Sequence, residues 1–293
     1  MKFYSYVFFL LAVSLTSRVS VGQSLPGNRS QPPVRLYVFD CGTFENINTK
    51  LLGLENNEVA ISKMSIPCFL VVHPKGKLIW DTGAVPDSLW NFTGAPVSYK
   101  LILPNGQRDF TLIKHLKMQL GEAGYTPSDI THLALSHFHY DHTANSNTFS
   151  KATWLVRQSE FDAMFAKQAP GATVPTTYSA LANSKKQIIT DDQYDVFGDG
   201  TVVIKSAPGH TIGHQVLFVK LVNTGNVVLS GDLYHYPEEK TLGRVPPIEF
   251  NQEQSRSSRS EIDLFLKATN AKLWIQHDYG ANAKLKKAPN YYD

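Results

Sequence analysis

The sequence predicts an α/β fold, a single domain in which two mixed β-sheets carry helices on their outer faces. Short stretches rich in β-branched and aromatic residues recur in both halves of the chain, bounded by turn residues and accompanied by helical periodicity. The 293 residues are 42% hydrophobic, enough for a large core, and no Pro-, Ser- or Gly-rich linker divides the chain after Gln31. We therefore expect one layered domain.

Apolar stretches in the first half predict strands, two of which form a hairpin around the turn at residues 73–76. Residues 85–108 show no clear period and carry scattered aromatic and proline residues, so they predict a long loop. From Phe110 to Leu120 apolar residues recur at roughly helical spacing and predict a helix. The expected strands are residues 34–39, 66–72, 77–80, 130–135 and 153–156, and a helix is expected to start within 159–165.

The second half repeats this outline. Its expected strands are residues 202–204, 215–222, 227–229 and 273–276. Between the third and fourth of these, residues 252–269 place Ile262, Phe265 and Leu266 on one face and predict an amphipathic helix.

The charge balance and the cysteine count exclude several classes of protein. The net charge is +3 and the charges are scattered, so the chain lacks the basic stripe that nucleic-acid binding requires. Two cysteines are too few for a disulfide scaffold or a thiolate zinc cluster. A metal site in this chain would need histidine and carboxylate ligands.

The N-terminus has the order of a secretory signal peptide. Lys2 is followed by a mostly apolar run and then by small and polar residues, which predicts cleavage near Gly22. The run is shorter than the ~20 apolar residues of a bilayer span, so we expect a signal peptide at 1–22, a flexible lead-in at 23–33 and no stable membrane anchor. The mature protein would be secreted or periplasmic. In that compartment Cys41 and Cys68 form either a disulfide or two buried free thiols.

Histidines and aspartates follow several expected strands. The run Ser-His-Phe-His-Tyr-Asp-His-Thr at 136–143 follows one strand, and its alternate residues can converge on one side of an extended segment. Four ligand-capable side chains in one loop suggest two metal ions, and a mixed set without cysteine favours a hydrolytic site. Further single candidates follow other strands: His210 in Ala-Pro-Gly-His-Thr, Asp232 in Ser-Gly-Asp, and His277 in Gln-His-Asp.

Together with Trp-Asp-Thr-Gly at 80–83, these motifs resemble the metallo-β-lactamase superfamily over nearly the whole mature chain, 34–293. The resemblance implies an αββα sandwich with two zinc or other divalent ions at the edge of the sheets. It implies that Asp81 orients a ligand from behind. One ion would be held by His137, His139 and His210, the other by Asp141, His142 and His277, with Asp232 bridging them.

Two divalent ions about 3.5–4 Å apart can share a water, lower its pKa and clamp the attacking and leaving oxygens. Asp141 could bind metal and also pass the proton of the bridging hydroxide to a leaving alkoxide. This chemistry predicts a metal-dependent hydrolase that acts on acyl or phosphoryl groups.

Stretches at 37–44, 231–235, 245–254 and 288–293 resemble exported N-acyl-homoserine lactonases, which act in quorum quenching, and the related methyl parathion hydrolases. The resemblance favours lactone opening, with phosphotriester hydrolysis or another metal-dependent esterase activity as the alternative. A homodimer is compatible with this reading, and the sequence leaves the oligomeric state open.

Three expectations concern the substrate. Some lactonases place a tyrosine three residues after the bridging aspartate, whereas this chain has His235 there, so His235 would bind substrate and the neighbouring Tyr236 would be the catalytic helper. Trp90 and Phe92 in the expected loop would form a wall for the acyl chain. The competing interpretation makes this loop a lid that packs on the core.

Other classes fit less well. Glyoxalase-II-type thioesterases add a helical domain, for which the chain after His277 is too short. β-Lactamases commonly use cysteine where this chain has Asp232, and nucleases of the superfamily need a basic groove. A non-catalytic binding module would usually lack some of the ligands, and here every ligand position is filled.

Overall fold

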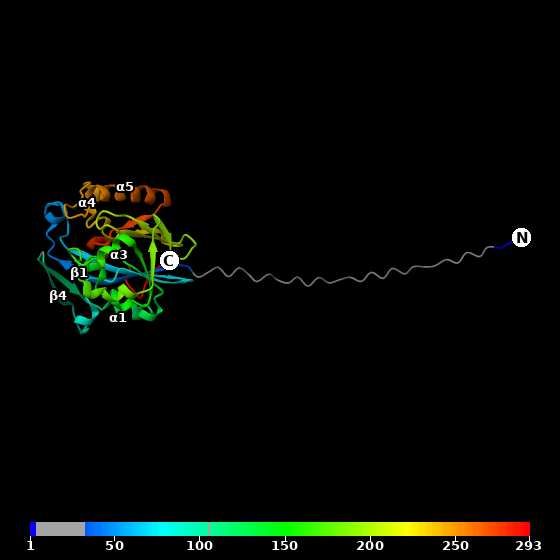
Figure 1. Cartoon of the computed structure of the whole chain (residues 1–293), viewed down its shortest axis with the longest axis horizontal. Helices are drawn as coiled ribbons and strands as arrows, with labels where there is room; N and C mark the ends of the chain where they lie inside the picture. The colour runs from blue at the N-terminus through cyan, green and yellow to red at the C-terminus, as the bar shows by residue number, and fades with distance from the viewer. Residues whose placement is uncertain (4–32, 105) are drawn as a thin grey trace. The chain divides into compact units, whose positions relative to one another are not determined.

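The apolar strands assemble into two sheets that lie against each other (Figure 1). The computed structural model describes residues 1–3, 33–104 and 106–293, so the predicted signal peptide and the lead-in lie almost entirely outside the described residues. Within the described part, the larger sheet has nine strands in the order β4-β5-β1-β2-β3-β6-β7-β8, with β14 beside β1. The smaller sheet has five strands in the order β13-β12-β11-β10-β9.

Both sheets are mixed, as predicted. β3, β6, β7 and β8 run parallel in the larger sheet, β12 and β13 run parallel in the smaller one, and the other neighbours are antiparallel. The strands of the larger sheet are β1 (Arg35–Glu45), β2 (Met64–His73), β3 (Gly76–Trp80), β4 (Val97–Leu103), β5 (Gly106–Leu112), β6 (His132–Ala134), β7 (Thr153–Arg157), β8 (Lys186–Ile189) and β14 (Tyr291–Tyr292). Those of the smaller sheet are β9 (Gln193–Asp195), β10 (Val202–Ser206), β11 (Gln215–Leu221), β12 (Gly225–Leu229) and β13 (Lys272–Trp274).

Alternation along the strands explains why the larger sheet is covered on both faces. In β1, Leu36 and Val38 belong to the apolar core between the two sheets, whereas Tyr37 and Phe39 belong to the core under the helices. Successive side chains of a strand point to opposite faces, so one apolar run supplies both cores.

Helices cover the outer faces of both sheets. Leu116 and Leu120 of α1 and Met164 of α3 pack on the larger sheet, and Ile262 of α5 is fully buried on the smaller one. Figure 1 shows α4 and α5 on one side of the sheets and α1 on the other, so the predicted αββα sandwich is confirmed. The helices are α1 (Leu116–Glu122), α2 (Tyr140–Thr143), α3 (Gln158–Met164), α4 (Pro237–Thr241), α5 (Gln252–Thr269) and α6 (Tyr279–Asn282).

Helix α5 has the bounds that its periodicity predicts. The Asn251 side chain accepts a hydrogen bond from the Gln254 amide and caps the first turn, and Asn270 adopts a left-handed conformation at the C-terminal cap. Burial of the Ile262 side chain against the smaller sheet contributes about 2 kcal/mol of hydrophobic stabilisation.

The predicted long loop at 85–108 is wrong in its second half. Val97–Leu103 forms β4 and Gly106–Leu112 forms β5, and the two pair as an antiparallel hairpin at the edge of the larger sheet. β4 alternates half-buried with exposed residues, and exposed Ile102 obscures this period of two in the sequence. A short 3₁₀ helix, η2 (Asp87–Leu89), lies in the first half.

The helix predicted from Phe110 begins only at Leu116. Phe110 and Leu112 lie in β5, where Phe110 pairs with Phe44 of β1. The centres of these two aromatic rings lie 4.9 Å apart. Pairing with β1 is a tertiary contact, and it overrides the local helical spacing.

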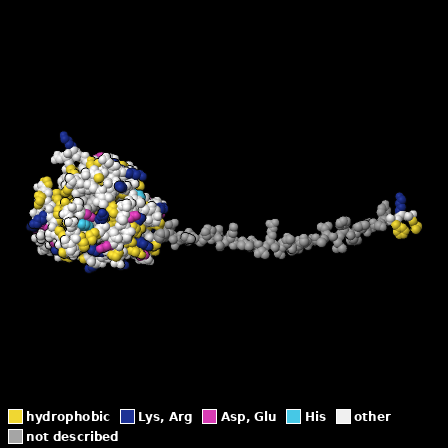
Figure 2. Space-filling model, turned by 90° about the horizontal axis from the view of Figure 1, so that it is seen from below, with side chains coloured by type: hydrophobic (Ala, Val, Ile, Leu, Met, Phe, Trp, Pro, Cys, Tyr) yellow, Lys and Arg dark blue, Asp and Glu magenta, His cyan; other side chains and the backbone are white. Residues whose placement is uncertain are grey.

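The disulfide alternative is the one observed: Cys41 and Cys68 form a disulfide, with Cα atoms 6.0 Å apart. Cys41 belongs to β1 and Cys68 to its antiparallel neighbour β2. Both residues are buried under the helices that cover the larger sheet. On the face shown in Figure 2, basic, acidic and hydrophobic side chains are interspersed.

Candidate metal centre

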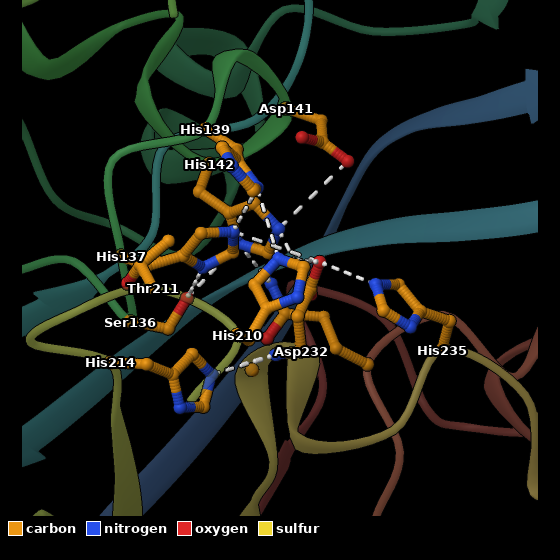
Figure 3. A network of polar contacts seen from close by, with 12 residues as sticks. Ser136, His137, His139, Asp141, His142, His210, Thr211, His214, Asp232 and His235 are labelled. Atoms are coloured by element: carbon orange, nitrogen blue, oxygen red, sulfur yellow. Dashed lines mark hydrogen bonds and ion pairs between the residues drawn. The ribbon is translucent and has the colours of Figure 1, made fainter. Parts of the chain in front are cut away.

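The predicted ligands come from loops that follow strands of both sheets. His137, His139, Asp141 and His142 follow β6 of the larger sheet. In the smaller sheet, His210 follows β10, Asp232 follows β12 and His277 follows β13. Figure 3 shows histidine side chains from several of these loops converging on Asp232. The structure thus brings all the predicted ligands to one place between the ends of the two sheets.

Three histidines form one half of the cluster. His139 Nδ1 lies 2.9 Å from His137 Nε2 and 3.0 Å from His210 Nε2. The three nitrogens and an oxygen of Asp232 all lie within 4.8 Å of one another, a spacing that allows a single ion to bind all four. Asp141, His142 and His277 form the other half at the same mutual spacing.

Asp232 lies between the halves and presents one oxygen to each. Its Oδ1 atom is 3.1 Å from His142 Nε2 and 3.0 Å from His277 Nε2. Its Oδ2 atom is 3.3 Å from His210 Nε2 and 3.7 Å from His137 Nε2. This is the arrangement that a bridging carboxylate requires.

Orphaned polar atoms provide a test of whether these residues fit a metal. His142 Nε2 and Asp232 Oδ1 are buried and lie 3.1 Å apart, but they form no hydrogen bond with each other or with any other described residue. A buried polar atom without a partner costs about 1–3 kcal/mol, and a divalent cation between them would supply the missing partner. The donors are imidazole nitrogens and carboxylate oxygens, which suit zinc and neighbouring divalent ions. The site fits a divalent metal.

Asp81 holds the ligand loop from behind. Its carboxylate accepts hydrogen bonds from the Ser136 amide at 2.6 Å and the Gln276 side chain at 2.8 Å, and lies 2.9 Å from His142 Nδ1. Because Nδ1 of His142 is held by Asp81, the Nε2 lone pair faces the cluster. The structure therefore places Asp81 where the resemblance implies.

Two further orienting contacts were not predicted. His210 Nδ1 lies 3.2 Å from Glu249 Oε1, and His277 Nδ1 lies 2.8 Å from the backbone oxygen of Ser65. Glu249 lies within the family-like stretch 245–254, but it contacts a histidine 39 positions away and no local motif marks it. Contacts between residues this far apart in the chain leave no recognisable pattern of spacing in the sequence.

Opposite charges perturb the pKa values at the centre of the cluster. Burial raises the pKa of Asp232, but His277 and His142 outweigh it and hold this pKa well below its usual range. Burial lowers the pKa of His142, but Asp232 and Asp81 reverse this and raise it well above its usual value. Burial lowers the pKa of His139, and the neighbouring His210 lowers it further.

His214 is a positioning residue rather than a ligand. Its Nε2 accepts a hydrogen bond from the Asp232 amide at 3.0 Å, and its Nδ1 lies 2.9 Å from the Ala207 carbonyl oxygen. Burial lowers the pKa of His214 to about 4, so it is neutral and can accept this bond. Gly231 has φ +49° and a Cβ there would lie 2.7 Å from His214 Nε2, so the turn before Asp232 requires glycine.

A cavity of about 610 Å³ opens onto the cluster. It is large enough for a small organic molecule. The cluster side is lined by His139, Asp141, His210, Asp232, His235 and His277. The apolar lining residues are Phe44, Ile47, Leu51, Leu52, Met64, Ile248 and Phe250, and the polar lining includes Gln107, Arg108 and Asp109.

The structure does not bring Trp90 or Phe92 to this cavity, which corrects the predicted acyl-chain wall. Trp90 packs edge-on against His115 at 4.2 Å between ring centres and contacts the core under the helices. The competing interpretation, a segment that packs on the core, describes Trp90. Phe92 is partly exposed outside the cavity lining.

Tyr236 also lies outside the cavity lining, contrary to its predicted catalytic role. Its ring packs with Leu52, Leu54 and Met64, and its hydroxyl is buried without a hydrogen-bond partner among the described residues. His235 does line the cavity, with Nε2 3.4 Å from Asp232 Oδ2 and Nδ1 3.0 Å from Glu239 Oε1.

The layered fold and the ligand cluster at its edge define a metal-dependent hydrolase. Comparison with known proteins specifies the family. A sequence profile of the metallo-β-lactamase superfamily matches residues 62–277, and the chain belongs to this superfamily.

Several characterised relatives are lactonases. The N-acyl homoserine lactonase AttM of Rhizobium radiobacter is 30% identical over 274 residues, which cover 88% of this chain and 98% of the relative. The N-acyl homoserine lactonase of Bacillus thuringiensis is 27% identical over 228 residues, 76% of this chain and 85% of the relative.

Solved structures show the same fold. A structure of an N-acyl homoserine lactone hydrolase with N-hexanoyl-L-homoserine at its catalytic metal centre aligns with a TM-score of 0.71 and 22% identity, covering 88% of this chain and 98% of that one. The dizinc quorum-quenching lactonase AidC aligns with a TM-score of 0.62 and 18% identity, covering 90% of this chain and 95% of that one.

Proposed function

We propose that this protein opens the lactone ring of N-acyl homoserine lactones at a centre of two zinc ions, and so acts in quorum quenching. The proposal depends on one observation: Asp232 divides the ligand cluster into two halves. A cavity that is partly lined by apolar residues opens beside them. The similarity to lactonases over most of the chain supports lactones as the substrate class.

The residues of the cluster are arranged to hold the two ions. His137, His139 and His210 would hold one, and Asp141, His142 and His277 the other, with Asp232 between them. Two bound divalent ions supply Lewis acidity and lower the pKa of a shared water. The chain's own contribution is to fix the rings: His142, His210 and His277 each have Nδ1 engaged by an oxygen, which turns Nε2 inward.

Asp141 is the residue placed to move a proton. It lines the cavity, and its Oδ2 atom lies 3.6 Å from His277 Nε2 and 3.8 Å from His142 Nε2. The carboxylate can accept a proton as the nucleophile attacks and deliver it to the leaving alkoxide. The imidazole ligands cannot do this while their lone pairs bind metal.

His235 takes the place of the substrate helper. Glu239 engages its Nδ1, and Arg259 in turn donates to Glu239 at 2.7 Å, so the ring is held with Nε2 toward the cluster. From there Nε2–H can donate to the substrate carbonyl oxygen. We expect His235→Phe to lower kcat about 10²-fold or more with little loss of bound metal, as measured by steady-state kinetics and elemental analysis. Unchanged kcat would contradict this role.

The acyl chain would lie against apolar residues that line the cavity. Leu51, Ile248 and Phe250 line it and are 49%, 52% and 63% exposed. Each CH₂ group of substrate buried against them contributes up to ~0.8 kcal/mol. These residues replace Trp90 and Phe92 as the proposed wall.

We also propose export, on the order of charged, apolar and small residues at 1–22. No helix among the described residues is long and apolar enough to cross a bilayer. The Cys41–Cys68 disulfide is typical of an oxidising compartment. N-terminal sequencing of the mature protein should find a start near Gln23. An intact Met1 on exported protein would contradict cleavage.

Matched substrate panels test the function directly. We expect a kcat/KM on N-acyl homoserine lactones well above that on phosphotriesters and on open-chain esters of the same acyl length. Faster turnover of phosphotriesters than of any lactone would assign the protein to the methyl parathion hydrolase type instead.

A further inference from the structure

A buried carboxylate outside the ligand cluster joins the loop after β6 to the loop after β10, and these two loops deliver four of the ligand histidines. Glu160 lies in the first turn of α3 and is 4% exposed. Its Oε1 atom accepts a hydrogen bond from the Phe138 amide at 2.9 Å, between His137 and His139 in sequence. Its Oε2 atom accepts from the Gly213 amide at 2.8 Å, in the loop that carries His210.

The Thr211 hydroxyl completes this contact. It lies 3.0 Å from each oxygen of Glu160 and follows His210 directly in sequence. Each carboxylate oxygen of Glu160 therefore accepts a hydrogen bond from one backbone N–H, and both oxygens contact the Thr211 hydroxyl. An amide in place of this carboxyl would turn an NH₂ group toward one of the two backbone N–H donors and lose that hydrogen bond.

The backbone is built to allow this approach. A Cβ on Gly213 would lie 2.7 Å from Glu160 Cβ and 2.9 Å from the Glu160 backbone nitrogen. The loop after His210 thus packs directly on the start of α3. Since Met164 of the same helix is buried in the core under the helices, the clamp is anchored to the body of the fold.

The two halves of the centre have different supports. Among the described residues, the side-chain hydrogen bonds of Glu160 go to Phe138, which lies between His137 and His139, and to Thr211 and Gly213, which follow His210. His142 is held by Asp81 and His277 by the Ser65 carbonyl oxygen. Glu160 also lies outside the lining of the cavity.

We propose that Glu160 is a positioning residue for the three-histidine half of the metal centre, fixing the loop after β6 against the loop after β10 so that His137, His139 and His210 converge on one ion. This inference rests on the proposed two-metal centre.

The test compares Glu160→Gln with wild type by competition against a zinc chelator at about pH 8, where the carboxyl is ionised although burial raises its pKa to about 7. We expect one zinc to bind about 10–100-fold more weakly, the usual effect of losing a residue that orients ligands, and the other to change less than about threefold. kcat should fall with KM for the lactone nearly unchanged.

Background variants show which half is affected. Adding Glu160→Gln to His277→Ala should weaken the remaining zinc further, because that ion sits in the three-histidine half. Adding it to His139→Ala should leave the remaining zinc unchanged. Equal effects in both backgrounds, or none in either, would overturn the inference.

Two more variants separate positioning from folding. Asp162→Asn removes an exposed carboxylate from the same helix, where it accepts from Gln158, and should leave both zinc affinities and kcat unchanged. Thr211→Val keeps Glu160 but removes the shared hydroxyl, and should weaken the same zinc, less than additively with Glu160→Gln. Additive effects, or a fall in the metal-free Tm without selective zinc loss, would show a merely structural role.

Wild type gives the reference for the proposed function. Wild-type protein that binds fewer than two zinc ions would contradict the two-metal centre itself. Wild type with two ions and a Glu160→Gln variant indistinguishable from it would overturn only the role of Glu160.

Discussion

The two oxygens of Asp232 face different sets of histidines, and this asymmetry distinguishes it from every other ligand. Oδ1 lies 3.0 Å from His277 Nε2, and Oδ2 lies 3.3 Å from His210 Nε2. Removing the carboxylate therefore takes an oxygen from both halves, whereas removing His277 takes a nitrogen from one.

We expect Asp232→Ala to weaken the binding of both ions, each by about tenfold or more, and His277→Ala to weaken one. Metal content after dialysis against a graded chelator series measures this. Loss of a single ion in both variants would argue against a bridging position for Asp232.

At this scale the sequence predicts ligands better than their surroundings. The loop at 136–143 and the single His or Asp after later strands are marked by spacing and by the family resemblance, so the side chains that converge in the cluster could be named. Glu249 and Glu160 act through contacts 39 and 53 positions away, for which a single sequence has no pattern. The position of Tyr236 beside His235 suggests a role in the site, but in the fold its ring packs in an apolar cluster.

Among the elements, the β4–β5 hairpin explains why the predicted acyl-chain wall is wrong. Reading 85–108 as a loop made Trp90 and Phe92 available to line the site. With β4 and β5 paired, Trp90 lines a small separate pocket together with Val97 and Leu112. The apolar face of helix α5 predicts its observed bounds, and in the structure the Asn251 side chain caps its first turn.

We expect Phe250→Ser to flatten the dependence of kcat/KM on acyl length, because it removes apolar wall while a short-chain substrate never reaches it. Extending the chain by four carbons gains up to about 3 kcal/mol in wild type if every CH₂ is buried, and less when burial is incomplete.

Trp90→Ala is the matched comparison. It should lower Tm and reduce activity equally at all chain lengths, since Trp90 supports the core. Rates on a series of homoserine lactones from short to long acyl chains measure both variants. If Trp90→Ala instead lowers kcat/KM only on long-chain lactones, Trp90 contacts the acyl chain after all.

For the molecule as a whole, the metal centre ties one sheet to the other. Strand β6 of the larger sheet leads into the loop with His137, His139, Asp141 and His142, and strands of the smaller sheet lead into His210, Asp232 and His277. The layers themselves were predictable, because apolar alternation marks the strands and the helical faces. The assignment of strands to two sheets came from the family resemblance, since single-sequence periodicity does not specify pairing.

Removing metal should therefore destabilise the whole fold. A free zinc concentration of about 1,000 times the Kd raises the free energy of unfolding by about 4 kcal/mol. For a chain of this size that is roughly a 10 °C change in Tm. Calorimetry of chelator-treated protein should show this fall and its reversal by zinc. A metal-free protein that unfolds at the same temperature would mean that the centre does not link the sheets energetically.

Lactone opening should require two ions in this cluster. Titration of metal-free protein with zinc tests this directly when lactonase activity is recorded against the number of ions bound per chain. We expect activity to approach its plateau only as the second ion binds. Full activity with one ion bound, or with none, would contradict it.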